Sequence, residues 1–163
     1  MRSNRFLGSA LTDAGLVTRD DLEKANEKFM DAIQNEEVKN ASIMTSLLFD
    51  LKVLDEARLI EFVTEEKGAG VIDLNAVEMP SLRTMNVDPG LCYATSTIPF
   101  DRVEETFLVA TCYYLSKPVV KHWEELLRGR VIWYATTMSA LASALERIEE
   151  MHAAEDAAAE DEA

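Results

Sequence analysis

One cysteine and one histidine are spaced such that a nucleophile and its base could meet. Cys112 follows residues 106–111, the strongest predicted strand, and His122 lies on the next predicted helix. A histidine within hydrogen-bonding reach can deprotonate a thiol, so the pair defines a candidate Cys-dependent enzyme. Alternatively, Cys112 is a small apolar residue buried at a strand end and His122 lies on the surface. We favour the second interpretation, because such a pair occurs by chance in many chains.

Adjacent carboxylates recur along the chain and could act as general acids or bases in a dry cleft. Each pair falls on a predicted polar helix face, a cap or a turn, which favours solvated side chains. The pairs are Asp20-Asp21, Glu36-Glu37, Glu65-Glu66, Glu104-Glu105 and Glu124-Glu125. The cysteines and histidines lack the paired spacing of metal ligands, so the sequence predicts no metal site.

The six glycines do not form a phosphate-binding loop. None belongs to Gly-x-x-x-x-Gly-Lys-Ser/Thr or to Gly-x-Gly-x-x-Gly. Gly68-Ala69-Gly70 is too short for such a loop, and we interpret it as a linker. The sequence therefore favours neither an ATPase nor a dinucleotide-dependent enzyme, and we expect no catalytic residue and no cofactor.

Charge and composition narrow the class of protein further. The chain of 163 residues carries 30 acidic and 16 basic side chains, a net charge of −14. This charge disfavours phosphate backbones and anionic lipids, so we expect no nucleic-acid polymer as partner. Apolar runs are far shorter than the roughly 20 residues of a membrane span, and the N-terminal residues do not resemble a signal peptide. With two cysteines, these features predict a cytoplasmic protein with reduced thiols and no direct membrane insertion.

A helical pattern occurs twice before Gly68. A shift of 37 residues places Leu11 on Leu48 and Thr18 on Asp55. Each copy is predicted to be a short helix, a tight turn and a second helix capped by Thr18 or Asp55. Neither copy can bury its apolar stripe alone, so the two should pack as a four-helix layer. Two unrelated αα-hairpins are the alternative, but the matched caps favour duplication.

The apolar stripes of these helices define the expected core of the first half. They comprise Leu7, Ala10, Leu11 and Ala14; Leu22, Ala25, Phe29 and Ile33; Met44, Leu47, Leu48 and Leu51; and Leu59, Phe62 and Val63.

After Gly70 the pattern alternates between short strands and helices, which predicts a small sheet covered by helices. Strands are expected at residues 71–74, 106–111 and 131–134, and residues 97–100 should start another that ends before a turn at Glu104-Glu105. Helices should begin at Pro89, Pro118 and near Thr137, with Gly129 ending the second of them. Pro99 should lie on an edge strand or near a strand end. The predicted order is β-α-β-β-α-β-α, and the predicted fold class is α+β.

The chain is expected to divide into three parts. Residues 1–67 form the helical repeat subdomain and residues 71–151 form the α/β subdomain. Residues 152–163 form a tail with five acidic side chains and no lysine or arginine. Its alanine-acid composition could prolong the last helix, but because it lacks an apolar stripe we expect a frayed or disordered end.

The first copy of the repeat resembles a known signature. The run Leu7-Gly8-x-x-Leu11-x-x-x-Gly15-Leu16-Val17 resembles the Leu-Gly-x-x-Leu-x-x-x-Gly-Leu-Ile motif of the N-terminal domain of type II secretion and type IV pilus assembly ATPases, the GspE or MshE N-terminal domain. The second copy and the order of segments after Val71 are also similar, so the resemblance covers roughly residues 5–150. It implies a helical repeat followed by an α/β subdomain, here as a stand-alone, divergent copy without the ATPase domains.

The resemblance implies two functions. In the family this domain docks on the cytoplasmic part of an inner-membrane assembly protein, which implies a protein partner in secretion, pilus or related signalling machinery. Some members bind cyclic di-GMP through both repeats, using an Arg-Leu-Gly at the start of each. For this chain that implies a nucleotide site at Arg5, Leu7, Gly8, Leu11 and Gly15.

The implied nucleotide site departs from the family pattern. Arg5 lies three residues before Gly8 instead of two, a rotation of roughly 100° on a helix. In the second copy Ile43 stands at the arginine position and Lys52 at the turn glycine. An anionic dinucleotide needs cationic or amide donors at its phosphates. The leading hypothesis is therefore a non-catalytic protein-interaction or regulatory domain, and the alternative is a cyclic di-GMP sensor.

Overall fold

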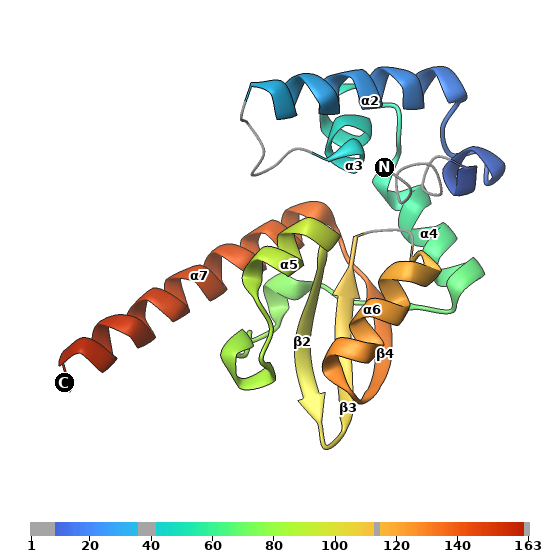
Figure 1. Cartoon of the computed structure of the whole chain (residues 1–163). Helices are drawn as coiled ribbons and strands as arrows, with labels where there is room; N and C mark the ends of the chain where they lie inside the picture. Colours follow the sequence, from blue (N-terminus) through green and yellow to red (C-terminus); the bar gives the residue numbers. More distant parts are fainter. Residues whose placement is uncertain (1–8, 36–41, 113–114, 162–163) are drawn as a thin grey trace.

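The computed structural model describes residues 9–35, 42–112 and 115–161. A layer of helices from the first half lies over one end of a mixed sheet that carries helices of its own (Figure 1). The expected α+β class is confirmed, with helices in the first half and a four-stranded sheet in the second.

The two copies of the repeat share their turn and their cap. Gly15 and its counterpart Lys52 both have left-handed backbone, with φ of 69° and 53°. Three residues later Thr18 caps α2 (Arg19–Gln34) and Asp55 caps α4 (Glu56–Lys67). The capping box at Thr18 is present, with the Thr18 amide donating to the Asp21 carboxylate at 2.9 Å. The predicted duplication is thus confirmed in local backbone structure.

The helix predicted around residues 44–51 is wound less regularly than expected. Ile43–Thr45 form α3, and Ser46–Asp50 form a π-helical turn, η2. The Leu51 amide donates to the Ser46 carbonyl at 2.8 Å, five residues back. The wide turn buries Leu48 and leaves the next side chain, Phe49, 47% exposed. Such turns often occur at functional sites.

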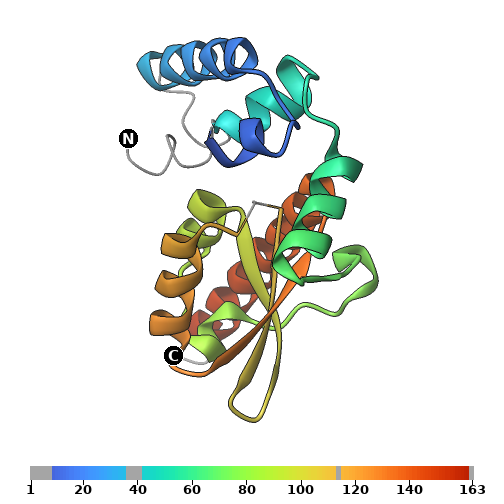
Figure 2. The same ribbon diagram turned by 90° about the vertical axis from the view of Figure 1, so that its right-hand side faces the viewer.

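The fourth helix of the first half also leaves the expected four-helix layer. Figure 2 shows α4 beside the sheet, below the layer that contains α2. It packs against two strands, β4 and β1. Its buried residues Leu59 and Val63 share a hydrophobic cluster with Ala135 at the end of β4. This helix therefore joins the helical layer to the sheet.

The sheet has the strand order β1-β4-β3-β2. The strands are β1 (Gly70–Val71), β2 (Thr97–Val103), β3 (Thr106–Thr111) and β4 (Arg130–Ala135). β2 and β3 are antiparallel, whereas β4 is parallel to both β3 and β1. Pro99 lies on the edge strand β2 beside an irregularity in pairing, as predicted. Val109 and Ala110 of β3 point to opposite faces and are both fully buried, so both faces of the sheet are covered.

Two boundaries in the second half differ from the prediction. The strand expected at 71–74 is only two residues long, because Asp73 caps the 3-10 turn η3 (Leu74–Ala76). The helix α6 (Lys117–Leu127) ends with Arg128 in left-handed backbone, not with Gly129. Gly129 is needed for a different reason, since a Cβ there would lie 2.5 Å from the Glu105 carbonyl oxygen.

The remaining helices begin where the sequence indicates. Asp88 caps α5 (Pro89–Thr95), and its carboxylate accepts from the Gly90 amide at 2.8 Å. α7 (Met138–Asp161) follows Thr137, whose hydroxyl accepts from the Ala140 amide at 3.2 Å. The order β-α-β-β-α-β-α is confirmed, with η3 and a second 3-10 turn, η4 (Leu82–Met85), added after β1.

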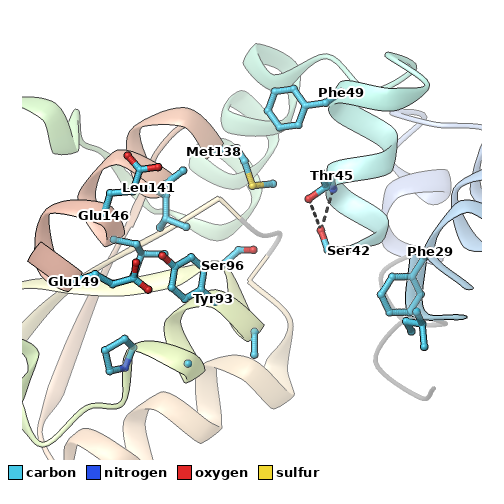
Figure 3. Close-up of a pocket in the computed structure, with 16 residues that line it drawn as sticks. Phe29, Ser42, Thr45, Phe49, Tyr93, Ser96, Met138, Leu141, Glu146 and Glu149 are labelled. Carbon is cyan, nitrogen blue, oxygen red and sulfur yellow. Dashed lines mark hydrogen bonds between the residues drawn. The ribbon is translucent and has the colours of Figure 1, made fainter. Parts of the chain in front are cut away.

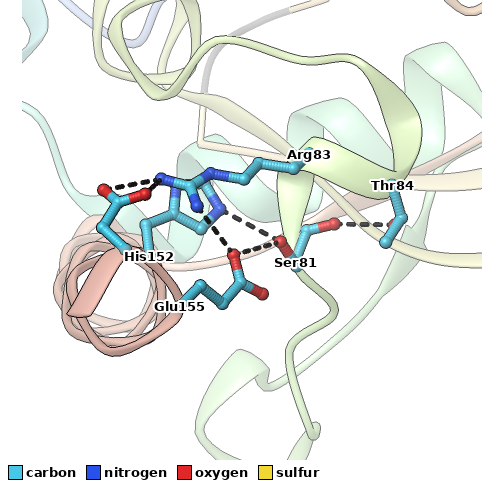
Figure 4. A network of polar contacts seen from close by, with 6 residues as sticks. Ser81, Arg83, Thr84, His152 and Glu155 are labelled. Carbon is cyan, nitrogen blue, oxygen red and sulfur yellow. Dashed lines mark hydrogen bonds and ion pairs between the residues drawn. The ribbon is translucent and has the colours of Figure 1, made fainter. Parts of the chain in front are cut away.

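Residues 152–161 of the acidic tail are helical. α7 continues through Asp161 as one long helix (Figure 1). Arg83 of η4 forms ion pairs with Glu155 at 3.3 Å and with Asp156 at 2.8 Å. Ser81 lies 3.3 Å from the Nε2 atom of His152 in the same cluster (Figure 4). The expected frayed or disordered end is therefore wrong for residues 152–161, because contacts distant in sequence hold a segment whose alanines already favour a helix.

Two hydrophobic clusters form the core, one among the first-half helices and one around the sheet. Trp133 and Met138 contact both clusters. Glu56 in the first turn of α4 accepts a hydrogen bond from the Met138 amide at 2.9 Å. A side chain of the first half therefore caps the helix that closes the second half.

Candidate functional site: a groove between the two halves

A groove of about 910 Å³ lies between the helical layer and the α/β part. One wall comes from α2, α3 and η2, and the other from α5 and α7 (Figure 3). Its lining is mainly apolar, with carboxylates at one side. The lining residues are Phe29, Ile33, Ser42, Thr45, Phe49, Pro89, Gly90, Tyr93, Ala94, Ser96, Met138, Leu141, Ala142, Leu145, Glu146 and Glu149.

The helical wall presents large apolar side chains to the groove. Phe49 is 47% exposed and Ile33 is 40% exposed. The sequence pattern placed Ile33 on a buried stripe, and the structure corrects this. The neighbouring Ser42 caps α3 by accepting from the Thr45 amide at 2.9 Å, which holds the start of this wall in place.

The opposite wall combines an apolar floor with an acidic rim. Met138, Leu141 and Leu145 follow one another at helical spacing along α7 and form the floor. Glu146 and Glu149 lie one turn apart on the same helix, and both are exposed. Figure 3 shows both carboxylates on the α7 side of the groove, across from Phe49 and Phe29.

Tyr93 of α5 links the rim to the groove floor. Burial raises the pKa of the Tyr93 hydroxyl to about 12, and its hydrogen bond to Glu149 adds to the rise. The phenol therefore stays protonated at neutral pH and donates to the carboxylate. Among the described residues that line the groove, none is lysine or arginine. Over the described residues, the groove is thus apolar with a negatively charged rim.

Of the residues of the implied nucleotide site, the two that the structure describes, Leu11 and Gly15, do not line this groove. Leu11 is fully buried in the helical cluster, and Gly15 forms the left-handed turn before α2. Arg5, Leu7 and Gly8 lie outside the described residues. The nucleotide site therefore stays a prediction from the sequence.

The candidate Cys–His pair does not form a reactive site. Cys112 is buried, and burial raises the pKa of its thiol to about 12. Its Sγ donates to the Ser96 carbonyl at 3.6 Å, whereas His122 is exposed on α6. A thiol with so high a pKa is a poor nucleophile at neutral pH. The interpretation of Cys112 as a buried apolar residue is the one that the structure favours.

The described part of the chain offers neither a metal site nor a membrane-spanning helix. Within residues 9–35, 42–112 and 115–161, no group of three or more His, Cys, Asp or Glu side chains could hold a metal ion. Over the same ranges no helix has both the length and the apolar character of a membrane span.

Sequence reasoning missed the groove. It assigned Phe29 to a buried stripe and gave no role to Phe49. One signal was present: Phe49 is a large aromatic residue outside the stripe of Met44, Leu47 and Leu48. The hydrogen bond between Tyr93 and Glu149 joins α5 to α7. Because these residues are far apart in the sequence, no local pattern predicts this contact.

Comparisons with known proteins identify relatives of this chain in sequence and in fold. No family model matches the chain. The type IV pilus assembly ATPase PilB of Thermus thermophilus is 29% identical over 146 residues, which are 88% of this chain and 16% of PilB. The chain therefore spans only a small part of that curated relative.

Solved structures agree with the sequence relative. The N-terminal domain of XpsE matches with a TM-score of 0.53 and 14% identity, covering 90% of this chain and 96% of that chain. A second crystal form of it matches with a TM-score of 0.52 and 12% identity, covering 88% and 94%. This chain has the fold of the XpsE N-terminal domain. The structure of MshE with cdg has a TM-score of 0.49 and 19% identity over 87% of this chain and 97% of that chain.

The resemblance to N-terminal domains of secretion and pilus ATPases is therefore confirmed in fold by XpsE and in sequence by PilB. At these identities the XpsE likeness describes the fold, and it assigns no partner and no ligand.

Proposed function

We propose that this chain is a non-catalytic protein-interaction or regulatory domain that docks on components of a bacterial secretion, pilus or related signalling machinery in the cytoplasm. The observation that carries the proposal is the XpsE N-terminal fold, which extends over 90% of the chain. The sequence relative PilB supports it, because the matching segment is a small part of an assembly ATPase.

The chemistry of the groove favours binding over catalysis. Its carboxylates, Glu146 and Glu149, lie at an exposed rim, where water solvates them. Its phenol is held protonated by burial and by the bond to Glu149. Large apolar side chains with a polar rim are typical of protein interfaces.

Crosslinking in the native host tests the docking function. The full chain with an affinity tag and a photoreactive residue in place of Val53, an exposed position on the helical layer, would be expressed, irradiated and purified under denaturing conditions. We expect mass spectrometry to identify an assembly component of a secretion or pilus system, enriched over a tag-only control. If replicate experiments at several exposed positions enrich no such component, the docking function is wrong.

A second candidate, a cyclic di-GMP sensor, is favoured by the preserved geometry of the repeat. Both copies keep the left-handed turn and the helix cap, and Lys52 places an exposed cation at the second turn. Cations near exposed backbone amides suit the phosphates of a cyclic dinucleotide. Retention of such a site would make the repeat a ligand sensor in addition to a docking element.

Calorimetric titration with cyclic di-GMP distinguishes the two candidates. The sensor hypothesis expects micromolar or tighter binding that is lost in Arg5→Ala and kept in Arg58→Ala, a control at an exposed arginine of α4. A docking domain that has lost the nucleotide site would give no heat of binding in any of the three proteins.

A further inference from the structure

We propose that the groove between the helical layer and α7 binds one amphipathic helix of a partner protein, whose apolar face enters the groove and whose lysine- or arginine-rich edge meets Glu146 and Glu149. This inference rests on the proposed docking function and names its surface and the chemistry of its partner.

The apolar walls carry the first part of the argument. Phe49 and Ile33 are 47% and 40% exposed, although each is a large side chain that water solvates poorly. They face the floor formed by Leu141 and Leu145 across the groove. Clustered apolar side chains that stay exposed in this way mark interaction sites more often than isolated ones do.

The size of the groove matches a helix. An α-helix with side chains is about 10 Å wide and rises about 1.5 Å per residue, so about 910 Å³ accommodates roughly two turns. The walls are themselves helices, with α2 and η2 on one side and α5 and α7 on the other. Docking of an amphipathic helix into a groove between helices is a common mode of peptide recognition.

Charge decides which helix fits. Glu146 and Glu149 are exposed on the rim, and neither takes part in the ion pairs found among residues 9–35, 42–112 and 115–161. No lysine or arginine lies among the described lining residues. An acidic peptide or an anionic nucleotide would bring like charge to this rim, whereas a basic edge would complement it.

Designed peptides test the inference directly. The probe is a fluorescent synthetic helix of about 18 residues, built of leucine and lysine so that leucine forms one face. One matched peptide has the same composition in scrambled order, and another has glutamate in place of lysine. We expect micromolar binding of the amphipathic basic helix by fluorescence anisotropy, and at least tenfold weaker binding of both matched peptides.

Two groove variants locate the binding. Glu146→Lys combined with Glu149→Lys should weaken binding of the basic helix at least tenfold, and Phe49→Ala should weaken it severalfold. The matched controls are Glu150→Lys, which changes an exposed acid of α7 outside the groove, and Val103→Ala, which changes an exposed apolar residue of β2. Circular dichroism would verify that every variant folds. Equal binding by the groove variants and their controls, or by the scrambled and amphipathic peptides, overturns the inference.

The host crosslinking experiment separates this inference from the proposed function. If the unmodified chain captures an assembly component and the Glu146→Lys, Glu149→Lys protein captures it equally well, docking is supported and the groove is not its site. If capture is lost in this double variant and kept in Glu150→Lys, both proposals are supported. Peptide binding at the groove without capture of any assembly component would support the groove site and contradict the proposed function.

Discussion

At the scale of single residues, Lys52 shows that a turn can be preserved without its usual amino acid. Gly15 and Lys52 occupy equivalent places in the two copies, and both have positive φ. Left-handed backbone costs a residue with a Cβ about 1 kcal/mol, which glycine avoids. The second copy therefore carries a strain that the first does not, while the left-handed backbone before Asp55 is kept.

Exchange of these two turn residues should shift stability in opposite directions. Lys52→Gly should raise the free energy of unfolding by about 0.5 kcal/mol, because relief of strain exceeds the added freedom of the unfolded chain. Gly15→Ala should lower it by about 1 kcal/mol, although a Cβ there meets nothing within 4 Å. Urea denaturation measures both. If both substitutions changed the free energy of unfolding in the same direction, the strain assigned to Lys52 would be wrong.

The two cysteines should resist thiol reagents in the folded protein. Burial raises the pKa of the Cys92 and Cys112 thiols to about 12 each. At neutral pH both stay protonated and shielded, so labelling by a disulfide reagent should follow the rate of unfolding. The measurement compares labelling in buffer and in urea. A thiol that reacts within seconds in buffer would contradict this prediction and support the hypothesis of a Cys-dependent enzyme.

At the scale of elements, the polar cluster of Figure 4 holds the end of α7 against η4. Arg83 bridges Glu155 and Asp156, and Ser81 bonds Glu155 at 3.2 Å. These groups are largely exposed, so each pair adds little stability by itself. Together they attach the alanine-rich end of α7 to the η4 region, whereas that end has no apolar stripe of its own with which to pack.

The titration of Asp156 should report this contact. The hydrogen bond from Arg83 holds the pKa of Asp156 below its ordinary value of 3.8. The interaction is therefore complete above about pH 4 and is lost as pH falls through the lowered pKa. Arg83→Ala should move the pKa of Asp156 back toward 3.8, measured by NMR of the side-chain carboxyl. Arg58→Ala is the control, and an equal pKa of Asp156 in both variants would rule out the contact in solution.

At the scale of the whole molecule, the two halves share a core. Trp133 and Met138 contact both hydrophobic clusters, and Glu56 of α4 caps the start of α7. The groove exists because α7 begins under the helical layer and continues past it. Its two walls are therefore positioned by the same contacts that join the halves.

Loss of the Glu56 cap should destabilise the whole molecule. Glu56→Ala removes the acceptor of the Met138 amide and should lower the free energy of unfolding by about 1 kcal/mol. Because the halves share a core, tryptophan fluorescence and circular dichroism should report one coincident transition in urea. Glu61→Ala, at an exposed site on α4, is the matched control. Separate transitions in the unmodified protein would contradict the shared core.

Local chemistry made much of the fold predictable. The caps at Thr18, Asp55 and Asp88 each act within three residues, and the strand at 106–111 follows from its own β-branched and aromatic composition. The 37-residue repeat was visible because turn and cap are short-range features. The groove was hidden, because whether Ile33 and Phe49 are exposed depends on which helix packs opposite them.

The sequence by itself determined where the capped helices begin, the order of strands and helices along the chain, the duplication, the acidic charge and the resemblance to secretion and pilus ATPase domains. The tertiary structure decided that α4 leaves the helical layer for the sheet, that α7 extends through the acidic tail, and that a groove with an acidic rim lies between the halves. The reason is physical: caps, turns and strand composition act between neighbours in the chain. The Glu56–Met138 and Arg83–Asp156 contacts join residues more than 70 positions apart, and only the packed chain brings them together.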